Sequence, residues 1–189
     1  MNASRLVHVV NGVLLLLLFG GSLWVYPTLP EQIPRHFGLY GQADAYWQAT
    51  LVHWLLLPVV ALVSAVALYG PAGIVRAVPS SWINVPNQAQ YDALPPVKKR
   101  AVMSLVQRAL YWMTTATLVV FLAVQGSVFY VATTAATALP VLGVGAMAVA
   151  LLAIAGLTGW LVWRLPKRIQ TLSGSPDESG GADLSLDDG

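Results

Sequence analysis

The chain has 189 residues, of which 57% are hydrophobic and only 10% are charged, and its mean hydropathy is +0.67. Soluble domains carry about 25% charged residues, so this composition excludes an ordinary soluble protein and predicts an integral membrane protein. The chain contains no cysteine, which excludes disulfides, thiolate chemistry and cysteine metal sites. The net charge is only +2 and no basic face or reading motif occurs, so we expect no nucleic-acid partner.

Several apolar runs are long enough to cross a bilayer, which takes about 20 residues. Residues 6–30, 45–75 and 109–163 contain no Asp, Glu, Lys or Arg. The last stretch is too long for one crossing, and the Thr- and Ala-rich segment 132–140 divides it. We therefore expect an all-α integral membrane protein that crosses the lipid bilayer with four transmembrane helices. The predicted spans lie near 6–25, 49–69, 109–131 and 140–163, within a membrane domain of residues 1–168.

Basic residues are distributed unequally between the two sides of this arrangement. Only Arg35 falls on one side, in the loop 26–47. By the positive-inside rule we expect this loop outside a cell membrane, and both termini in the cytoplasm with the loop 70–108. The basic residues on the expected cytoplasmic side are Arg5, Arg76, Lys98, Lys99, Arg100, Arg108, Arg164, Lys167 and Arg168.

The two ends of the chain carry different patterns. Residues 1–22 could be a signal peptide with Arg5 as its charged start, but the long apolar core without an A-x-A site favours a retained helix. The C-terminal segment 169–189 is rich in Gly, Ser and acidic residues and has little to bury. We expect this segment to be a disordered acidic tail.

The outer loop 26–47 combines prolines, aromatic residues and charges. Pro30 and Pro34 restrict backbone dihedrals, which predicts a short, stiff and irregular cap over the helices. Gly41 permits a turn, and Asp44 is a candidate N-cap of the second span.

The loop 70–108, here called the inner loop, carries a second pattern, in which Pro95 and Pro96 can begin a helix. Apolar residues then recur at helical spacing opposite Lys98, Lys99 and Arg100, which predicts a basic amphipathic helix leading into the third span. Such a helix would anchor on lipid headgroups or dock a cytoplasmic regulator, and both interpretations remain open.

No catalytic motif is present, because the chain has no GxSxG, HExxH or phosphate loop. The possible metal ligands Glu31, His36, Asp44 and His53 match no compact ligand spacing. We therefore expect no enzyme activity, no cofactor and no metal.

Two polar residues, Asn11 and Gln125, lie well inside predicted spans. Polar groups in lipid are costly and often functional, so a small transporter or channel component is one alternative. Hydrogen bonding between helices in a purely structural membrane scaffold is another.

The outer loop resembles the membrane family that carries domain of unknown function 1648, whose pattern runs roughly L-P-x-x-I-P-x-H-F-x-x-x-G-x-x-D-x-[YW]. The inner stretch 82–100 resembles a second pattern found in many members, N-[IL]-P-N-K-x-Y-x-x-x-P-x-x-R-R. The matching candidate residues are Pro30, Pro34, His36, Phe37, Gly41 and Asp44 in the outer loop, and Asn84, Pro86, Asn87, Tyr91, Lys99 and Arg100 in the inner one.

This resemblance implies a non-catalytic receptor or immunity-type protein that binds an extracellular peptide or envelope component. Distant relatives of the family include the immunity proteins for the sporulation-delaying toxin, which protect the producing cell and sequester a cytoplasmic repressor. His36 and Asp44 would then either bind the ligand or hold the cap together.

Overall fold

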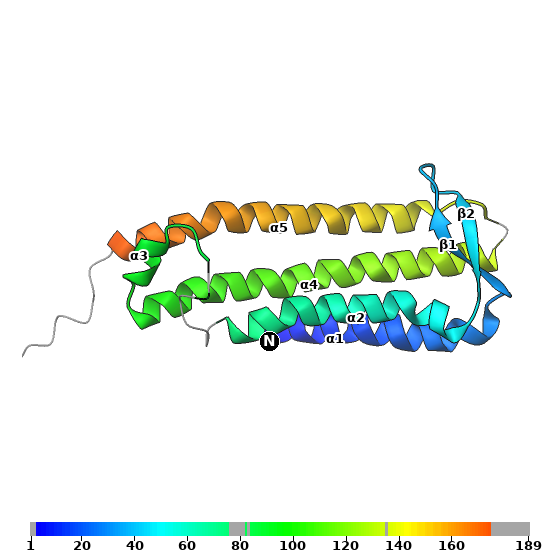
Figure 1. Cartoon of the computed structure of the whole chain (residues 1–189), viewed down its shortest axis with the longest axis horizontal. Coiled ribbons are helices and arrows are strands. Elements are labelled where there is room, and N and C mark those ends of the chain that lie inside the picture. Colours follow the sequence, from blue (N-terminus) through cyan, green and yellow to red (C-terminus); the bar gives the residue numbers. More distant parts are fainter. Residues whose placement is uncertain (1–2, 76–81, 83, 135, 175–189) are drawn as a thin grey trace, which may run out of the picture.

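The computed structural model describes residues 3–75, 82, 84–134 and 136–174. Arg76, one of the basic residues expected on the cytoplasmic side, and the tail residues 175–189 lie outside the described residues. Four long helices run side by side, and the N-terminus of the first lies toward the same end of the bundle as the C-terminus of the last (Figure 1). These helices are α1 (Ala3–Val25), α2 (Leu51–Ile74), α4 (Pro96–Thr133) and α5 (Val141–Gly174).

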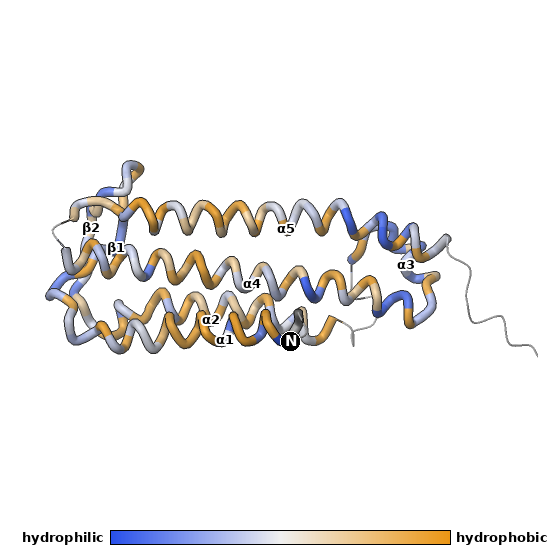
Figure 2. Tube along the Cα trace, turned by 180° about the vertical axis from the view of Figure 1, so that it is seen from behind, coloured by the Kyte–Doolittle hydropathy of each residue, from blue (hydrophilic) through white to orange (hydrophobic). Residues whose placement is uncertain are grey.

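All four helices are long and apolar enough to cross a membrane, as many as the sequence predicts. Hydrophobic residues dominate their middle parts, and hydrophilic ones gather toward the two ends of the bundle (Figure 2). At 1.5 Å per residue, α1 and α2 are about 35 Å long, which is near the thickness of a bilayer core. α4 and α5 exceed about 50 Å and extend past the other two at the end that carries the termini.

The prediction of an irregular outer loop is wrong. The loop folds into an antiparallel β-hairpin of β1 (Gln32–Phe37) and β2 (Ala43–Gln48), preceded by the 3₁₀ turn η1 (Tyr26–Thr28). Pro34 is compatible with β1 because this strand is an edge and its register is irregular beside Pro34, where a missing N–H costs little. Along β2, half-buried and exposed residues alternate with the period of two that a strand requires. The protein is therefore mostly helical rather than all-α.

The hairpin lies across one end of the bundle and is tied to the connection between α4 and α5 (Figure 1). Ala43 N–H donates to the Thr137 carbonyl at 3.2 Å, and Leu139 N–H donates to the Gly41 carbonyl at 3.0 Å. Gly41 has the predicted turn conformation, with a φ of +75°, which favours glycine. Asp44 lies in β2 and does not cap α2; Thr50 is the N-cap, and its hydroxyl accepts from His53 N–H at 3.2 Å.

α4 is the central helix, since α1, α2 and α5 all pack against it. Between α1, α2 and α4 the apolar core contains Leu18, Ala61, Ala65 and Leu118. α5 packs mainly along α4, so the bundle is a three-helix core with a fourth helix laid against one side.

The crossing of α4 and α5 is close at one point. A Cβ on Gly143 would clash with the Ser127 hydroxyl, whereas a Cβ on Gly145 would meet nothing within 4 Å. Small residues of this kind let membrane helices approach closely.

We expect Gly143→Ala to lower the free energy of unfolding by about 1–3 kcal/mol, because the added methyl group overpacks this crossing. Gly145→Ala on the same helix is the matched control and should be close to neutral. The double variant Gly143→Ala/Ser127→Ala should recover part of the loss, since it removes the clashing hydroxyl. Thermal unfolding in detergent measures all three, and equal effects of the two glycine variants would contradict the close crossing.

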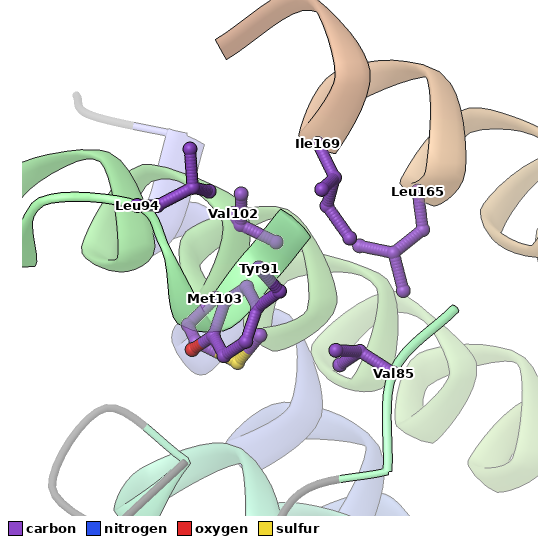
Figure 3. Close-up of a cluster of buried hydrophobic side chains, with 7 residues drawn as sticks. All are labelled: Val85, Tyr91, Leu94, Val102, Met103, Leu165 and Ile169. Atoms are coloured by element: carbon purple, nitrogen blue, oxygen red, sulfur yellow. The ribbon is translucent and has the colours of Figure 1, made fainter. Parts of the chain in front are cut away.

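Beyond the predicted spans, a compact apolar cluster joins α3 (Gln88–Asp92) to the first turns of α4 and the last turns of α5 (Figure 3). Pro96 is the first residue of α4, as Pro95 and Pro96 predicted, and the helix runs without a break into the third span. Val97 is 76% exposed, so it lies outside this cluster. The buried members are Val85, Tyr91, Leu94, Val102, Met103, Leu165 and Ile169.

The cluster corrects the predicted start of the C-terminal tail. Ile169 is fully buried and Leu165 is nearly so, and α5 continues to Gly174. Residues 169–174 are therefore helix rather than disordered tail, because Leu165 and Ile169, four residues apart, share the face that packs on α3 and α4.

Candidate functional site

His36 and Asp44 come together across the hairpin. Nδ1 of His36 lies 2.6 Å from Oδ1 of Asp44, and the two side chains are 66% and 51% exposed. The shared hydrogen bond orients both groups, although an exposed pair of this kind contributes only about 0.2–1 kcal/mol to stability. Gly38 allows this approach, since a Cβ there would lie 3.2 Å from the Asp44 carboxylate.

Arg35 of β1, Trp47 of β2 and His53 of the first turn of α2 form a stack. The Arg35 guanidinium lies 5.7 Å from the centre of the Trp47 ring, and His53 stacks on Trp47 with 4.8 Å between ring centres. Nδ1 of His53 lies 2.9 Å from the Gln48 carbonyl. Because a carbonyl only accepts, His53 must carry its proton on Nδ1 for this bond, and Nε2 of the neutral ring is then an acceptor.

A pocket of about 200 Å³ lies between the hairpin, the first turns of α2 and the C-terminal half of α4. Its walls are mainly apolar and aromatic, with a guanidinium, an imidazole and a carboxamide among them. This combination is typical of small binding sites, in which a few polar groups orient a ligand within an apolar lining. The lining includes Pro34, Arg35, Phe37, Trp47, His53 and Gln125.

Buried hydrogen bonds hold the base of this pocket. Trp54 is 2% exposed and its indole N–H donates to the Ser22 carbonyl at 2.7 Å. The Gln125 amide, which is 5% exposed, donates to the Trp54 carbonyl at 3.2 Å. α1, α2 and α4 are thereby joined directly beneath the hairpin.

The structure does not bring all the predicted outer residues together. Pro34 and Phe37 line the pocket, whereas His36 and Asp44 form the exposed pair outside it. Pro30 is exposed before β1, and Gly41 shapes the hairpin turn without lining the pocket.

The prediction missed Arg35, Trp47 and His53 as members of one site. Arg35 did carry a signal, since it is the only basic residue in the outer loop, but its stacking on Trp47 depends on the hairpin register. Within the described residues no group of three or more His, Cys, Asp or Glu side chains is placed to hold a metal ion.

The inner candidate residues lie at the other end of the bundle, and one of them, Tyr91, is a buried member of the apolar cluster. Tyr91 is buried in this cluster, and burial together with the nearby Asp92 carboxylate raises the pKa of its phenol. Lys99 donates to the Asp92 carbonyl at 2.9 Å, and its ammonium lies 5.8 Å from the Tyr91 ring centre.

Asn87 adopts the left-handed conformation, with φ +57°, immediately before α3. Asn84, Pro86 and Arg100 are exposed around this turn.

The two polar residues of the predicted spans lie in different parts of the bundle. Gln125 belongs to the pocket near the hairpin, whereas Asn11 bonds to Tyr69 and Thr115 toward the opposite end. The Asn11 amide donates to the Tyr69 hydroxyl at 3.0 Å, and Thr115 donates to the Asn11 carbonyl oxygen at 2.8 Å. Both residues thus make hydrogen bonds between helices.

Fold and site together describe a multi-pass membrane protein with a hairpin-covered pocket at one end and a compact apolar cluster at the other. Residues 13–62 match a protein family model described as a domain of unknown function (DUF1648). The match covers most of α1, the whole hairpin and the first half of α2, and thus the complete outer motif. No curated protein and no solved structure matches the chain.

Proposed function

We propose that this chain is a non-catalytic receptor or immunity-type protein that binds an extracellular peptide or envelope component at the pocket beneath the hairpin. The observation that carries the proposal is the stack of Arg35, Trp47 and His53 beside a pocket whose inner wall includes the buried Gln125. Protection against a toxic peptide, as in the immunity proteins for the sporulation-delaying toxin, is one form of this function.

The chemistry of the stack favours a ligand with an anionic group. Arg35 is exposed, and within the described part of the chain no carboxylate lies within 4 Å of it. A guanidinium resting on an indole ring keeps its donors available for a carboxylate or phosphate. His53 Nε2 can accept a further hydrogen bond, and the apolar wall around Phe37 suits a hydrophobic side chain of a peptide.

The distribution of charge supports a defined orientation in the cell membrane. Arg35 is the one basic residue of the outer loop, whereas the opposite end carries Arg5, Lys99 and Arg168 among others. By the positive-inside rule the hairpin then faces outward and both termini face the cytoplasm. A cytoplasmic regulator would meet the exposed basic surface around Arg100, beside the apolar cluster.

We favour binding over transport because Asn11 and Gln125, the two residues on which the transport alternative rests, are engaged in helix packing. Asn11 bonds to α2 and α4, and Gln125 bonds to the backbone of α2. A transporter or channel made from this chain would need a further path for its solute.

A direct test compares synthetic peptides that differ only in a free or amidated C-terminus, with the protein held in lipid nanodiscs. We expect the free carboxylate to bind more tightly, and Arg35→Gln to weaken its binding about tenfold or more, since a charge-assisted hydrogen bond is lost. Arg168→Gln, which removes an exposed charge at the opposite end, is the control. The proposal fails if the two peptides bind alike and Arg35→Gln has no greater effect than Arg168→Gln.

The same assay separates the pocket from the exposed pair. If His36 and Asp44 only hold the hairpin, His36→Ala and Asp44→Ala should each lower stability by less than about 1 kcal/mol and leave peptide affinity unchanged. If the pair contacts the ligand, peptide affinity falls while stability and protein level remain as in the wild type.

A further inference from the structure

The flank of α5 carries another recess, whose lining shares no residue with the hairpin pocket. A groove of about 500 Å³ runs between α4 and α5, and its lining is apolar except for Thr115. Many α5 side chains that do not face α4 are exposed, so the groove opens toward the membrane. The lining includes Trp112, Ala116 and Val119 of α4 and Ala146, Val149 and Ala153 of α5.

The length of the groove matches one bilayer leaflet. Its lining extends along α5 from Gly145 to Leu157, which corresponds to about 18 Å at 1.5 Å per residue. Half of the hydrocarbon core of a bilayer is about 15 Å thick. Because lipid chains surround a membrane helix, the natural filler of such a recess is an acyl chain.

Two arginines lie just beyond one end of the groove, on the same helix faces. Arg108 precedes the lining residue Trp112 by four positions on α4, and Arg164 follows Leu157 by seven positions on α5. Residues four and seven apart share a helix face, so both guanidinium groups belong to the groove side. Both side chains are exposed, and within the described part of the chain neither has a carboxylate within 4 Å.

Aromatic residues flank these arginines. Trp160 is 43% exposed on the same face as Arg164, and Lys167 lies over the Trp163 ring at 3.7 Å. Tryptophan gathers at the depth of the lipid headgroups, where an amphipathic ring is best accommodated. The end of the groove thus lies where a headgroup phosphate meets the protein.

We propose that this groove is a binding site for an anionic glycerophospholipid. One acyl chain lies between α4 and α5 against Ala146, Val149 and Ala153, and the headgroup phosphate accepts hydrogen bonds from Arg108 and Arg164. A second copy of the chain is a poorer occupant. In a parallel pair of copies the arginines at this end would face arginines of the same charge, which is unfavourable.

The first experiment measures lipid retention by native mass spectrometry of the full chain, with phosphatidylglycerol and phosphatidylcholine of identical acyl chains. We expect the wild type to retain phosphatidylglycerol preferentially. Arg108→Gln and Arg164→Gln should each lower that retention about fivefold, whereas Arg5→Gln, an equal loss of charge on α1, should not. Equal retention of the two lipids by the wild type, or an equal effect of Arg5→Gln, overturns the proposal.

The second experiment tests the acyl-chain part of the site. Ala153 lines the groove, and Ala155, also exposed, does not. Ala153→Phe should abolish lipid retention while Ala155→Phe preserves it. If Ala153→Phe leaves retention unchanged, or instead alters the ratio of monomer to dimer in nanodiscs, the groove is not a lipid site.

A probe that leaves the packing intact guards against variants that fail to fold. The chain has no cysteine, so a single fluorescent label can be placed at Ala146→Cys in the groove or at the exposed Ala148→Cys outside it. Brominated phosphatidylglycerol should quench the label at position 146 more strongly than brominated phosphatidylcholine does, and the difference should vanish at position 148. The same quenching by both lipids at position 146 would count against the site.

Discussion

Trp54→Ala is expected to destabilise this protein more than any other single substitution considered, by about 3–5 kcal/mol. Trp54 is 2% exposed, and its ring lies against Phe129 of α4. It belongs to the apolar cluster that also contains Ile33 of β1. Its removal leaves a large cavity beneath the hairpin and also frees the Ser22 carbonyl of its donor. Both losses act at the point where α1, α2 and α4 meet.

The measurement is thermal or denaturant unfolding in the same detergent for a graded series. Trp54→Phe keeps most of the packing and loses only the indole donor, so its cost should be about 1–3 kcal/mol. Trp24→Ala, which removes the same side chain from a position that is 82% exposed, should cost little. If Trp24→Ala matched Trp54→Ala, burial at the base of the pocket would not be the cause.

Ile169→Ala is expected to have the second largest effect, about 2–5 kcal/mol, because Ile169 is fully buried where α3, α4 and α5 meet, beyond the predicted spans. In water the hydrophobic effect favours burial of the Ile169 side chain, whereas it does not act on residues that face lipid. The damage should be local, since the cluster is separate from the core between α1, α2 and α4.

Limited proteolysis is therefore the informative readout. In Ile169→Ala the segment from Val85 to Met103 should become protease-sensitive while the spans remain protected. Val97→Ala, a change at a position 76% exposed near the same cluster, is the matched control. Uniform loss of protection over the whole chain would show that the cluster and the membrane bundle unfold as one unit.

The spans could be predicted because a helix in a bilayer must satisfy its own backbone and cover a set length. Charge-free runs of about 20 residues are then sufficient to locate them. Pro96 at the start of α4 and Gly41 in the hairpin turn were likewise predictable, since each depends on the local backbone of one residue. The resemblance of the outer loop was visible in the sequence for the same reason, as its motif is contiguous.

The hairpin was not predicted because the alternation in Ala43–Gln48 is one of burial, which its residue types do not show, and because proline opposes a strand. Proline opposes a central strand but not an irregular edge strand, and only the pairing of β1 with β2 reveals which of these applies. The end of α5 was misplaced in a similar way. Leu165 and Ile169 are followed by a polar tail, and their burial depends on α3, which lies far away in the sequence.

By itself, the sequence determined that this is a membrane protein with four spans, where its outer motif lies, and where single residues begin a helix or permit a turn. Hydropathy and backbone geometry act over a few residues and can be read along the chain. Only the tertiary structure decided that Arg35, Trp47, His53 and Gln125 share one pocket, that His36 pairs with Asp44, and that α4 and α5 leave a groove between them. These contacts join distant segments, and they exist only once helix packing and strand register are set.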